Sequence, residues 1–469
     1  MSWQTIVKEN NLDVSVVSSL KLNEELRIDA EYHKPKYLRE ENDLLKLSRL
    51  SIGELCFVTD GQHGYHEEDE NSNIKFLTAK NAKGWFADGE NVVRVAQWVD
   101  EKNKRSSLHS KDLILSTRGT VGLCAIVGEE ILPAQIDQDV ARICLNADAG
   151  ISPEFLLAYL NCSFGQDWMI RNTTGNVQQG LSLDKVRKMP IPVLSKNFQD
   201  RISSLIVEAK KKSQSSVASN KEAEKLLLEE INLEGYVSSK ENTSIRELTE
   251  CLTDNRFDAE YWEPRFDEME KRVSAVPQEE LGEIVLMQKG IDPGSEAYIE
   301  NGKAFVRVSD ISIYGIEEGD KKISDELYEE LKADYKPQKG EILFTKDGTI
   351  GISFALHEDI DVIVSGAFLR LKPKIKINID YLTLVLNSLY CKFQIERMSG
   401  GAIIAHLKPE NVKKIKVPVL SDAKQKELAE KATSSLRLRN EAKELLEKAK
   451  RAVEIFIEKD EQEALKYLA

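Results

Sequence analysis

Two glycine-containing turns are the first segments in which chemistry could be expected. The pattern G-T-x-G occurs at residues 119–122 and again at residues 348–351. Phosphate-binding loops bring backbone N–H groups to an anion and lead directly into a helix, whose positive end adds to the binding. Each turn here lies instead between two apolar runs that are typical of strands. We therefore do not expect a nucleotide site at either turn.

Other motifs of catalysis are absent from the sequence. It contains no G-x-x-x-x-G-K-[ST] loop, no G-x-S-x-G elbow and no H-E-x-x-H zinc helix. None of the six histidines lies in a repeated position with a Ser, a Cys or a pair of carboxylates. The cysteines have no C-x-x-C spacing, which is typical of reduced core residues rather than of disulfides or zinc ligands; they are Cys56, Cys124, Cys144, Cys162, Cys251 and Cys391. We predict no catalytic residue and no metal site.

The bulk properties limit the class of protein. A chain of 469 residues is too long for one ordinary core, so several domains are expected. No run is long and apolar enough for a membrane helix, and the first residues lack the pattern of a signal peptide, so we expect a soluble, cytoplasmic protein. A formal net charge of −14 counts against a protein that coats nucleic acid through a broad basic surface. If the chain binds DNA, a local patch or a partner must help.

The sequence repeats itself over most of its length. The hexapeptide R-I-D-A-E-Y at residues 27–32 returns as R-F-D-A-E-Y at residues 256–261, a displacement of 229 residues. The segment D-L-I-L-S-T-R-G-T-V-G at residues 112–122 aligns without gaps with E-I-L-F-T-K-D-G-T-I-G at residues 341–351, at the same displacement. Later matches, such as V-R-K-M-P-I-P-V-L with V-K-K-I-K-V-P-V-L, are displaced by 226 residues. The order and spacing of these matches indicate a tandem duplication, a pseudo-dimer on one chain.

Each half has the same expected order of elements. Short β-rich runs alternate with Gly, Asn and Asp turn signals, which predicts a small, mostly antiparallel sheet. In the first half a helix should begin near Ser152, Pro153 and Glu154, since this order suits a cap and a first helical turn. A long helix follows each Pro-bearing stretch, with apolar residues spaced by three and four. At about 33 residues such a helix is ~50 Å long.

The two long helices are expected to pair with each other. An antiparallel pair within the chain acts as a spacer, because duplicated halves supply matched apolar stripes; two independent coiled coils for dimerisation are the alternative. We therefore predict an α+β fold: two tandem, pseudo-twofold-related domains, each a small β-rich sheet with helices, separated by two long antiparallel coiled-coil helices. The predicted bounds are residues 1–196 for the first domain, 197–234 for the central helix, 235–421 for the second domain and 422–469 for the C-terminal helix.

The polar loops differ between the halves although their scaffold repeats. The loop D-G-Q-H-G-Y-H-E-E-D-E-N-S-N of the first half stands against Q-K-G-I-D-P-G-S-E-A-Y-I-E-N-G in the second. A protein that reads two different targets would have this pattern. With the R-[IF]-D-A-E-Y motif, the two G-T-x-G segments and the P-I-P-V-L exit into a long helix, the chain resembles the specificity subunits of type I restriction–modification systems over nearly its whole length.

The resemblance implies a function and a set of partners. Such a subunit has no catalysis of its own, and each of its two domains reads one half of a bipartite, asymmetric site in double-stranded DNA. The helices hold the domains apart and set the length of the unread spacer. The family's subunits dock two methyltransferase subunits that use S-adenosylmethionine, and a restriction subunit that uses ATP and Mg can join. Those cofactors would belong to the partners, and none is expected in this chain.

Base reading requires paired donors or acceptors, with Arg or Lys suited to guanine and Asn or Gln to adenine. Residues of these types, together with neighbours in the same loops, are expected on exposed loops held by the sheet, although each could be an ordinary solvated residue. In the first domain the candidates are Gln62, His63, Tyr65, Lys80, Asn81, Arg118, Thr120, Gln178 and Gln179. In the second domain they are Lys289, Arg307, Ser309, Lys346, Asp347, Thr349, His406 and Lys408.

Two further points stay open. Asp347 stands where the first half has Arg118, and Lys346 where it has Thr117, so the two turns are not strictly equivalent. Asp29 and Asp258 are repeated beside aromatic residues; they could anchor a methyltransferase, cap a helix or pair with a neighbouring Arg. Two other functions fit the pattern: a coiled-coil adaptor that binds proteins, and the specificity subunit of a related system in which nuclease and methyltransferase share one partner chain.

Overall fold

The computed structural model describes residues 14–17, 27–90, 92–174, 180–241, 243–317, 319–399 and 406–469. The chain forms two compact units: residues 1–211 with 441–469, and residues 212–440. Each unit contains one copy of the duplicated sequence and part of each long helix.

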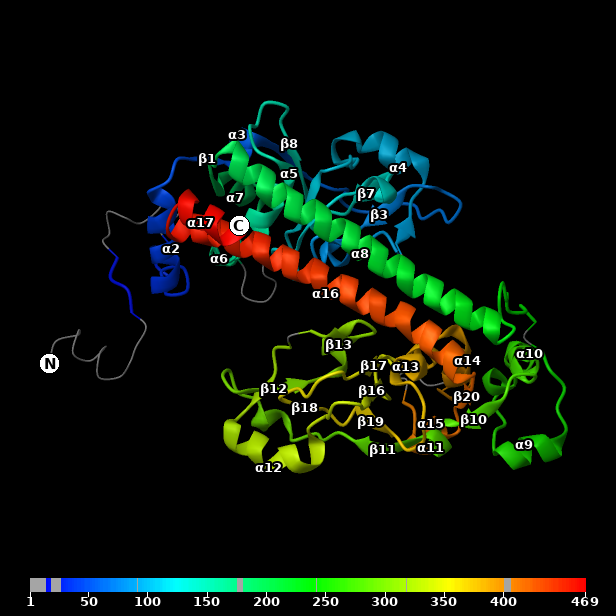
Figure 1. Cartoon of the computed structure of the whole chain (residues 1–469). Helices are drawn as coiled ribbons and strands as arrows, with labels where there is room; N and C mark the ends of the chain where they lie inside the picture. The colour runs from blue at the N-terminus through cyan, green and yellow to red at the C-terminus, as the bar shows by residue number, and fades with distance from the viewer. Residues whose placement is uncertain are drawn as a thin grey trace. The chain divides into compact units, whose positions relative to one another are not determined.

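The first unit is built on two small sheets (Figure 1). One is antiparallel, with the order β2 (Cys56–Asp60), β8 (Val140–Leu145), β5 (Leu113–Ser116) and β6 (Cys124–Ile126). The other has the order β4 (Val93–Arg94), β3 (Lys75–Leu77) and β7 (Ala134–Ile136). The mostly antiparallel sheet is confirmed, but β3 and β7 pair in parallel, a contact that strand patterns alone do not reveal.

Helices cover the four-stranded sheet of this unit. They are α2 (Pro35–Leu45), α3 (Ile52–Leu55), α5 (Pro153–Asn161), α6 (Ser163–Arg171) and α7 (Leu183–Lys188). α5 begins where the sequence predicted, because the Ser152 side chain accepts a hydrogen bond from the Phe155 N–H and Pro153 needs no N–H partner. Phe155 and Tyr159 of α5 are fully buried in the main core. The short pair β1 (Arg49–Ser51) and β9 (Pro190–Pro192) leads into the long helix.

The second unit repeats this topology. Its four-stranded sheet has the order β11 (Val285–Lys289), β19 (Phe368–Pro373), β16 (Ile342–Thr345) and β17 (Ser353–Ala355), and its three-stranded sheet the order β15 (Lys322–Ile323), β12 (Lys303–Val306) and β18 (Val362–Val364). Again one pair, β12 with β18, is parallel. Helices α10 (Pro264–Val273), α13 (Ile379–Asn387), α14 (Leu389–Ser399) and α15 (Pro409–Lys413) follow the same plan. The shared topology confirms the duplication.

The units differ in detail as well. The second has the helix α12 (Asp325–Tyr335), and the first has the shorter helix α4 (Gln97–Lys102) at a similar place in the chain. Both units contain a buried ion pair between neighbouring elements: Arg142 with Asp112 at 2.7 Å, and Arg370 with Glu341 at 2.9 Å. An arrangement of the sheet that separated either pair would leave a buried charge without a partner, which is strongly unfavourable. The pairs therefore restrict how the sheet can pack.

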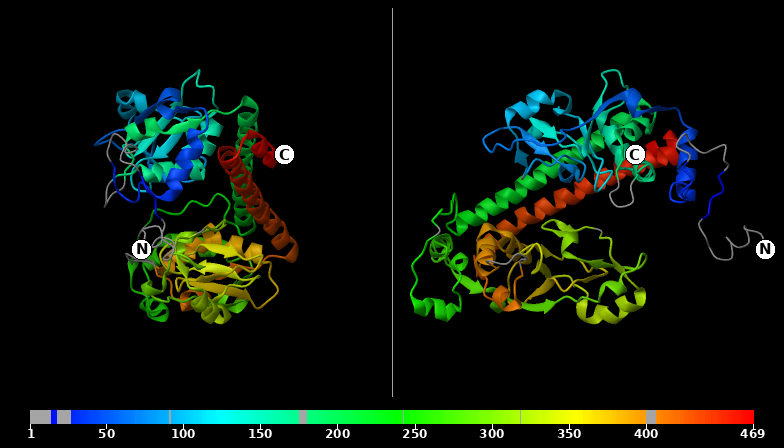
Figure 2. Two further views of the ribbon diagram at one scale, coloured as in Figure 1. Left: turned by 90° about the vertical axis from the view of Figure 1, so that its left-hand side faces the viewer. Right: turned by 180° about the vertical axis from the view of Figure 1, so that it is seen from behind.

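The two long helices are α8 (Lys196–Glu230) and α16 (Asp422–Glu458). In each unit their segments lie side by side and run antiparallel (Figure 2): Phe198 packs on Phe456 in the first unit, and Glu222 pairs with Lys431 in the second. The expected helix pair is therefore confirmed. The C-terminal helix ends before residue 469, however, because Asp460 caps a separate helix, α17 (Glu461–Leu468).

A buried polar contact fixes the register of the helix pair in the second unit. The Ser216 hydroxyl donates to the Ser435 carbonyl oxygen at 2.8 Å, and the Ser435 hydroxyl donates to the Ser216 carbonyl oxygen at 2.7 Å. Both side chains are almost fully buried. A slip of either helix would leave these hydroxyls without partners, so the contact selects one register.

Two sequence predictions can be compared directly with the structure. The six cysteines are all free, and four of them are buried in the cores. Burial raises the pKa of the Cys56, Cys162 and Cys391 thiols to about 12, so these groups stay protonated and unreactive. Among the described residues no helix is both long enough and apolar enough to span a bilayer.

Candidate functional site

In the first unit, loops of the predicted site meet at the turn that joins β7 to β8. Gly61 donates its backbone N–H to the Asp137 carbonyl oxygen at 3.2 Å, and Thr117 donates to the Asp139 carbonyl oxygen at 2.8 Å. A Cβ atom at Gly61 would lie only 1.9 Å from the Ile136 carbonyl oxygen, so this approach requires glycine. The turn therefore holds two of the candidate loops at one end of the sheet.

A third segment joins them from the end of α6. Thr174 and Gly180 exchange two backbone hydrogen bonds of 2.9 Å, and Leu181 donates to the Thr117 carbonyl oxygen at 2.8 Å. Gly180 also forms a β-bridge with Arg118. The structure thus brings the Arg118 turn next to Gly180 and Leu181. The candidates Gln178 and Gln179 lie outside the described residues.

Exposed charges gather at this end of the first unit. Arg118 Nη1 lies 3.2 Å from Asp139 Oδ1, and the two side chains are 49% and 36% exposed. His63 Nε2 lies 2.8 Å from Asp60 Oδ2. Burial opposes the ionisation of Asp60, but hydrogen bonds from His63 and Arg105 outweigh it and lower its pKa. The ion pairs are accessible, so their partners can be exchanged for polar groups of a ligand.

One more carboxylate at the turn escaped the sequence reasoning. Asp137 is not among the predicted site residues, yet its backbone forms part of the junction. Burial raises its pKa to about 6, and the neighbouring Asp139 adds to this, although the Asp139 N–H stabilises the charged form. An acid that follows a buried strand could have been noticed from the sequence, but its burial could not.

The other candidates of the first unit divide into two groups. Gln62 is buried, and its amide is used within the unit: Nε2 donates to the Tyr65 carbonyl oxygen at 2.7 Å, and Oε1 accepts from Asn103. Asn81 caps a short helical turn through the Thr78 N–H at 2.9 Å. These two amides shape loops instead of facing solvent. The remaining candidates are exposed: Tyr65, Lys80 and Thr120.

The second unit has the same frame around the turn that joins β18 to β19. Gly290 donates to the Phe368 carbonyl oxygen at 3.1 Å, Lys346 to the Ala367 carbonyl oxygen at 2.8 Å, and Leu407 to the Lys346 carbonyl oxygen at 2.8 Å. These bonds correspond to those that gather the loops of the first unit. The frame is therefore repeated while the side chains on it change.

The side chains at this second junction form a cluster of three. The Asp347 carboxylate pairs with both Lys346 and His406, and Lys346 is buried. Burial opposes the ionisation of Asp347, but the hydrogen bonds from Lys346 and His406 outweigh it and lower its pKa. The non-equivalence expected from the sequence is confirmed, since an Arg–Asp pair in one unit is matched by a Lys–Asp–His cluster in the other.

The remaining candidates of the second unit lie around the junction. Arg307 is partly buried and pairs with Asp320, and Ser309 donates to the Asp310 carboxylate at 2.7 Å. Both side chains are thus engaged within the unit. Three further candidates are exposed: Lys289, Thr349 and Lys408.

The repeated hexapeptide has a defined structural role. Asp29 pairs with Arg27 through two hydrogen bonds of 2.8 and 2.9 Å, and Asp258 pairs with Arg256 in the same way. Hydrogen bonds from these arginines lower the pKa of both aspartates. Of the roles left open by the sequence, the structure places both aspartates in a pair with a neighbouring Arg; whether they also dock a methyltransferase stays a prediction.

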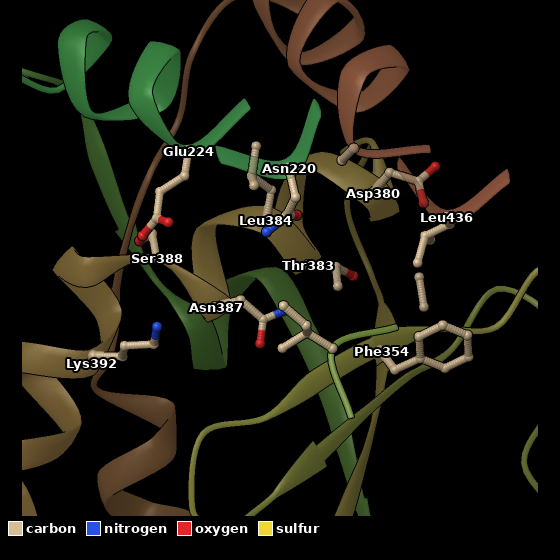
Figure 3. Close-up of a pocket in the computed structure, with 13 residues that line it drawn as sticks. Asn220, Glu224, Phe354, Asp380, Thr383, Leu384, Asn387, Ser388, Lys392 and Leu436 are labelled. Carbon is tan, nitrogen blue, oxygen red and sulfur yellow. The ribbon is translucent and has the colours of Figure 1, made fainter. Parts of the chain in front are cut away.

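A small cavity in the second unit lies between the long helices and the domain (Figure 3). Its volume is about 80 Å³, and Asn220 of α8, Thr383 of α13 and Phe354 of β17 line it. This volume accommodates a few water molecules but no cofactor. None of the candidate reading residues lines the cavity.

One family model and several solved structures match the chain. Residues 274–448 match the family model of the type I restriction modification DNA specificity domain. A search of the curated proteins finds no match. Among solved structures, the type I restriction–modification S subunit from M. genitalium is 15% identical, with a TM-score of 0.38 over 90% of this chain and 95% of that chain. The HsdS subunit from Thermoanaerobacter tengcongensis is 14% identical, with a TM-score of 0.26 over 90% and 96%.

At these TM-scores the structural matches add nothing to the assignment, which rests on the family model and on the duplication. The family model covers the second copy of the repeat. The first copy has the same sequence landmarks, the same strand orders and the same junction of loops. Residues 274–448 therefore form a type I restriction modification DNA specificity domain, and the first unit repeats the sequence landmarks and strand orders of that domain.

Proposed function

We propose that each unit reads one half of a bipartite DNA site and that α8 and α16 set the unread spacer between the half-sites. The observation that carries this proposal is that both units have the same backbone arrangement at the loop junction but present different side chains on it. The loop junction is repeated, but it presents Arg118 with Asp139 in the first unit and Asp347 with His406 in the second. Different side chains on one frame suit two different half-sites.

The chemistry of these groups is suited to base edges. An Arg guanidinium donates two hydrogen bonds to guanine O6 and N7, and a carboxylate accepts from the amino group of cytosine. In the free chain Arg118 and Asp139 satisfy each other across 3.2 Å while both remain partly exposed. A guanine edge offers Arg118 acceptors in place of Asp139, which leaves the carboxylate free to accept from a neighbouring base. We expect the Arg118 turn to face a G·C pair.

The proposal assigns catalysis and cofactors to partner subunits. Two methyltransferase subunits would bring S-adenosylmethionine, a restriction subunit would bring ATP and Mg, and the complex would act on DNA in the cytoplasm. The net charge of −14 supports this division, because phosphate contacts require cationic surface that partners can supply. This chain would contribute base reading and geometry, with no catalytic residue of its own.

The test is reconstitution with the methyltransferase subunit that the proposal requires as a partner. Mass measurement in solution should give two methyltransferase subunits per chain, and methyl transfer to plasmid DNA should require both components. Arg118→Ala should change the bases accepted in one half-site only, whereas Lys188→Ala, at an exposed ion pair of α7 in the same unit, should change neither. A stable complex that binds DNA without sequence preference would instead favour a protein adaptor.

A further inference from the structure

The R-[IF]-D-A-E-Y segment of the first unit holds the end of a helix. Arg27 uses Nε and Nη2 to grip Asp29, and its Nη1 donates to the carbonyl oxygens of Arg171 and Thr173 at 3.3 and 3.5 Å. Those carbonyls lie at the C-terminal end of α6, where no helical N–H is available for them and the helix dipole is negative. Arg27 therefore caps α6 from a segment that is distant in sequence.

An aromatic ring locks this cap in place. The Tyr32 ring lies between two guanidinium groups, with Arg27 at 4.5 Å and Arg171 at 4.2 Å from its centroid. Arg171 also donates to the Tyr32 carbonyl oxygen at 2.8 Å and to Glu41 at 3.2 Å. We call this arrangement the arginine clamp: two arginines stacked on one tyrosine, with an aspartate that holds the first.

The second unit builds the same clamp from its own copy of the motif. Arg256 grips Asp258, stacks on Tyr261 at 4.4 Å and donates to the Met398 carbonyl oxygen at 3.3 Å. Arg397 lies 4.6 Å from the Tyr261 centroid and donates to Glu270, as Arg171 donates to Glu41. The motif is displaced by 229 residues but the second arginine by 226. The clamp is thus repeated although the chain between its parts has changed length.

The clamped helix end lies close in sequence to the loop junction. Three residues after Arg171, Thr174 pairs with Gly180, and Gly180 bridges to Arg118. In the second unit His406 bridges to Asp347 after α14. In the first unit the path from the clamp to Arg118 therefore consists of a helix end and two backbone bridges. In the second unit residues 400–405, between α14 and His406, lie outside the described residues. A shift of the C-terminal end of α6 would therefore move the Arg118 turn.

We propose that Arg27 and Arg256 are positioning residues for sequence reading, each fixing in its own unit the helix end that aligns the reading turn. The inference rests on the proposed function, because it assumes that each unit reads its own half-site. Base reading tolerates only small errors, since hydrogen-bond donors must meet base edges within a few tenths of an ångström. A loosened clamp would therefore weaken discrimination before it abolishes binding.

The test uses Arg27→Lys and Arg256→Lys in the complex with the methyltransferase. Lysine keeps the charge but loses the planar fork and the stack on tyrosine. We expect Arg27→Lys to lower the ratio of methylation at correct sites to single-mismatch sites by about tenfold in one half-site, with the other half-site within about twofold of wild type. Arg256→Lys should give the mirror result. Lys34→Ala, at an exposed surface ion pair in the same segment, should leave both ratios unchanged.

The outcomes separate positioning from a purely structural role. A structural role would lower the midpoint of thermal unfolding and the yield of complex but leave both mismatch ratios at wild-type values. That result, or equal relaxation of both half-sites, would overturn the inference. If the wild-type complex itself methylates no bipartite site, the proposed function fails; if it does and the variants keep wild-type ratios, only the positioning role fails.

Discussion

Shortening the helix pair by one heptad should shorten the unread spacer and leave the half-sites unchanged. The perturbation removes residues 209–215 from α8 and residues 436–442 from α16. These segments face each other, because the helices are antiparallel and Ser216 pairs with Ser435 just beyond them. The deletion keeps both serines, so the shortened pair retains the contact that fixes its register.

The magnitude comes from helix geometry. Seven residues at ~1.5 Å each remove ~10 Å of helix, and their loss rotates the remainder of the helix by only ~20°. B-form DNA rises ~3.4 Å per base pair, so the gap between half-sites should shorten by at most about three base pairs. α8 and α16 contain 35 and 37 residues, so most of their paired length remains.

The assay is a comparison of the methylated motifs of wild type and variant, mapped on genomic DNA by long-read sequencing. The same two half-sites with a shorter fixed gap would support the division between reading units and spacer helices. Altered half-sites with an unchanged gap would refute it. Deletion of residues 209–215 from α8 alone is the control; it should reduce stability, because the Ser216–Ser435 contact and the Phe198–Phe456 contact then cannot both stay in register.

Two further predictions concern stability. Glu341→Gln should destabilise the second unit by about 3 kcal/mol in urea unfolding, because it leaves the buried Arg370 charge uncompensated, whereas Asp200→Asn at an exposed pair should cost under about 1 kcal/mol; equal effects would contradict the role of burial. Burial and the adjacent Asp167 raise the pKa of Glu40 from 4.5 to about 8, so the folded chain keeps a proton that the unfolded chain releases, and stability should fall as pH rises from about 5 to 8. Glu40→Gln should remove most of the change in the midpoint of thermal unfolding over this pH range. A midpoint that falls with pH as steeply as that of the wild type would contradict the assignment.

Much of the architecture was accessible from the sequence because it depends on local patterns. The duplication appears as repeated landmarks, and the long helices appear as apolar residues spaced by three and four. The start of α5 at Pro153 was predictable from the capping residue Ser152. Each of these features is visible in the order and spacing of residues along the chain, so no knowledge of distant contacts was needed.

The features that were missed depend on contacts between distant residues. The parallel pair β3 and β7 joins Lys75 to Ala134, and no strand pattern states which strands are neighbours. Gln62 lies in a polar loop and has the sequence context of a free amide. Its Oε1 nevertheless accepts a hydrogen bond from Asn103, which lies 41 residues later. The arginine clamp is similar, since the hexapeptide is recognisable as a repeat but its partner Arg171 lies 139 residues beyond Tyr32.

The most direct test of the central claim is a map of methylated bases after co-expression of this chain with its methyltransferase partner. The account predicts one bipartite motif, with two different half-sites and a gap of fixed length. A single continuous motif, or a stable complex that methylates no defined sequence, would contradict the claim that two units on one chain read two halves of a DNA site.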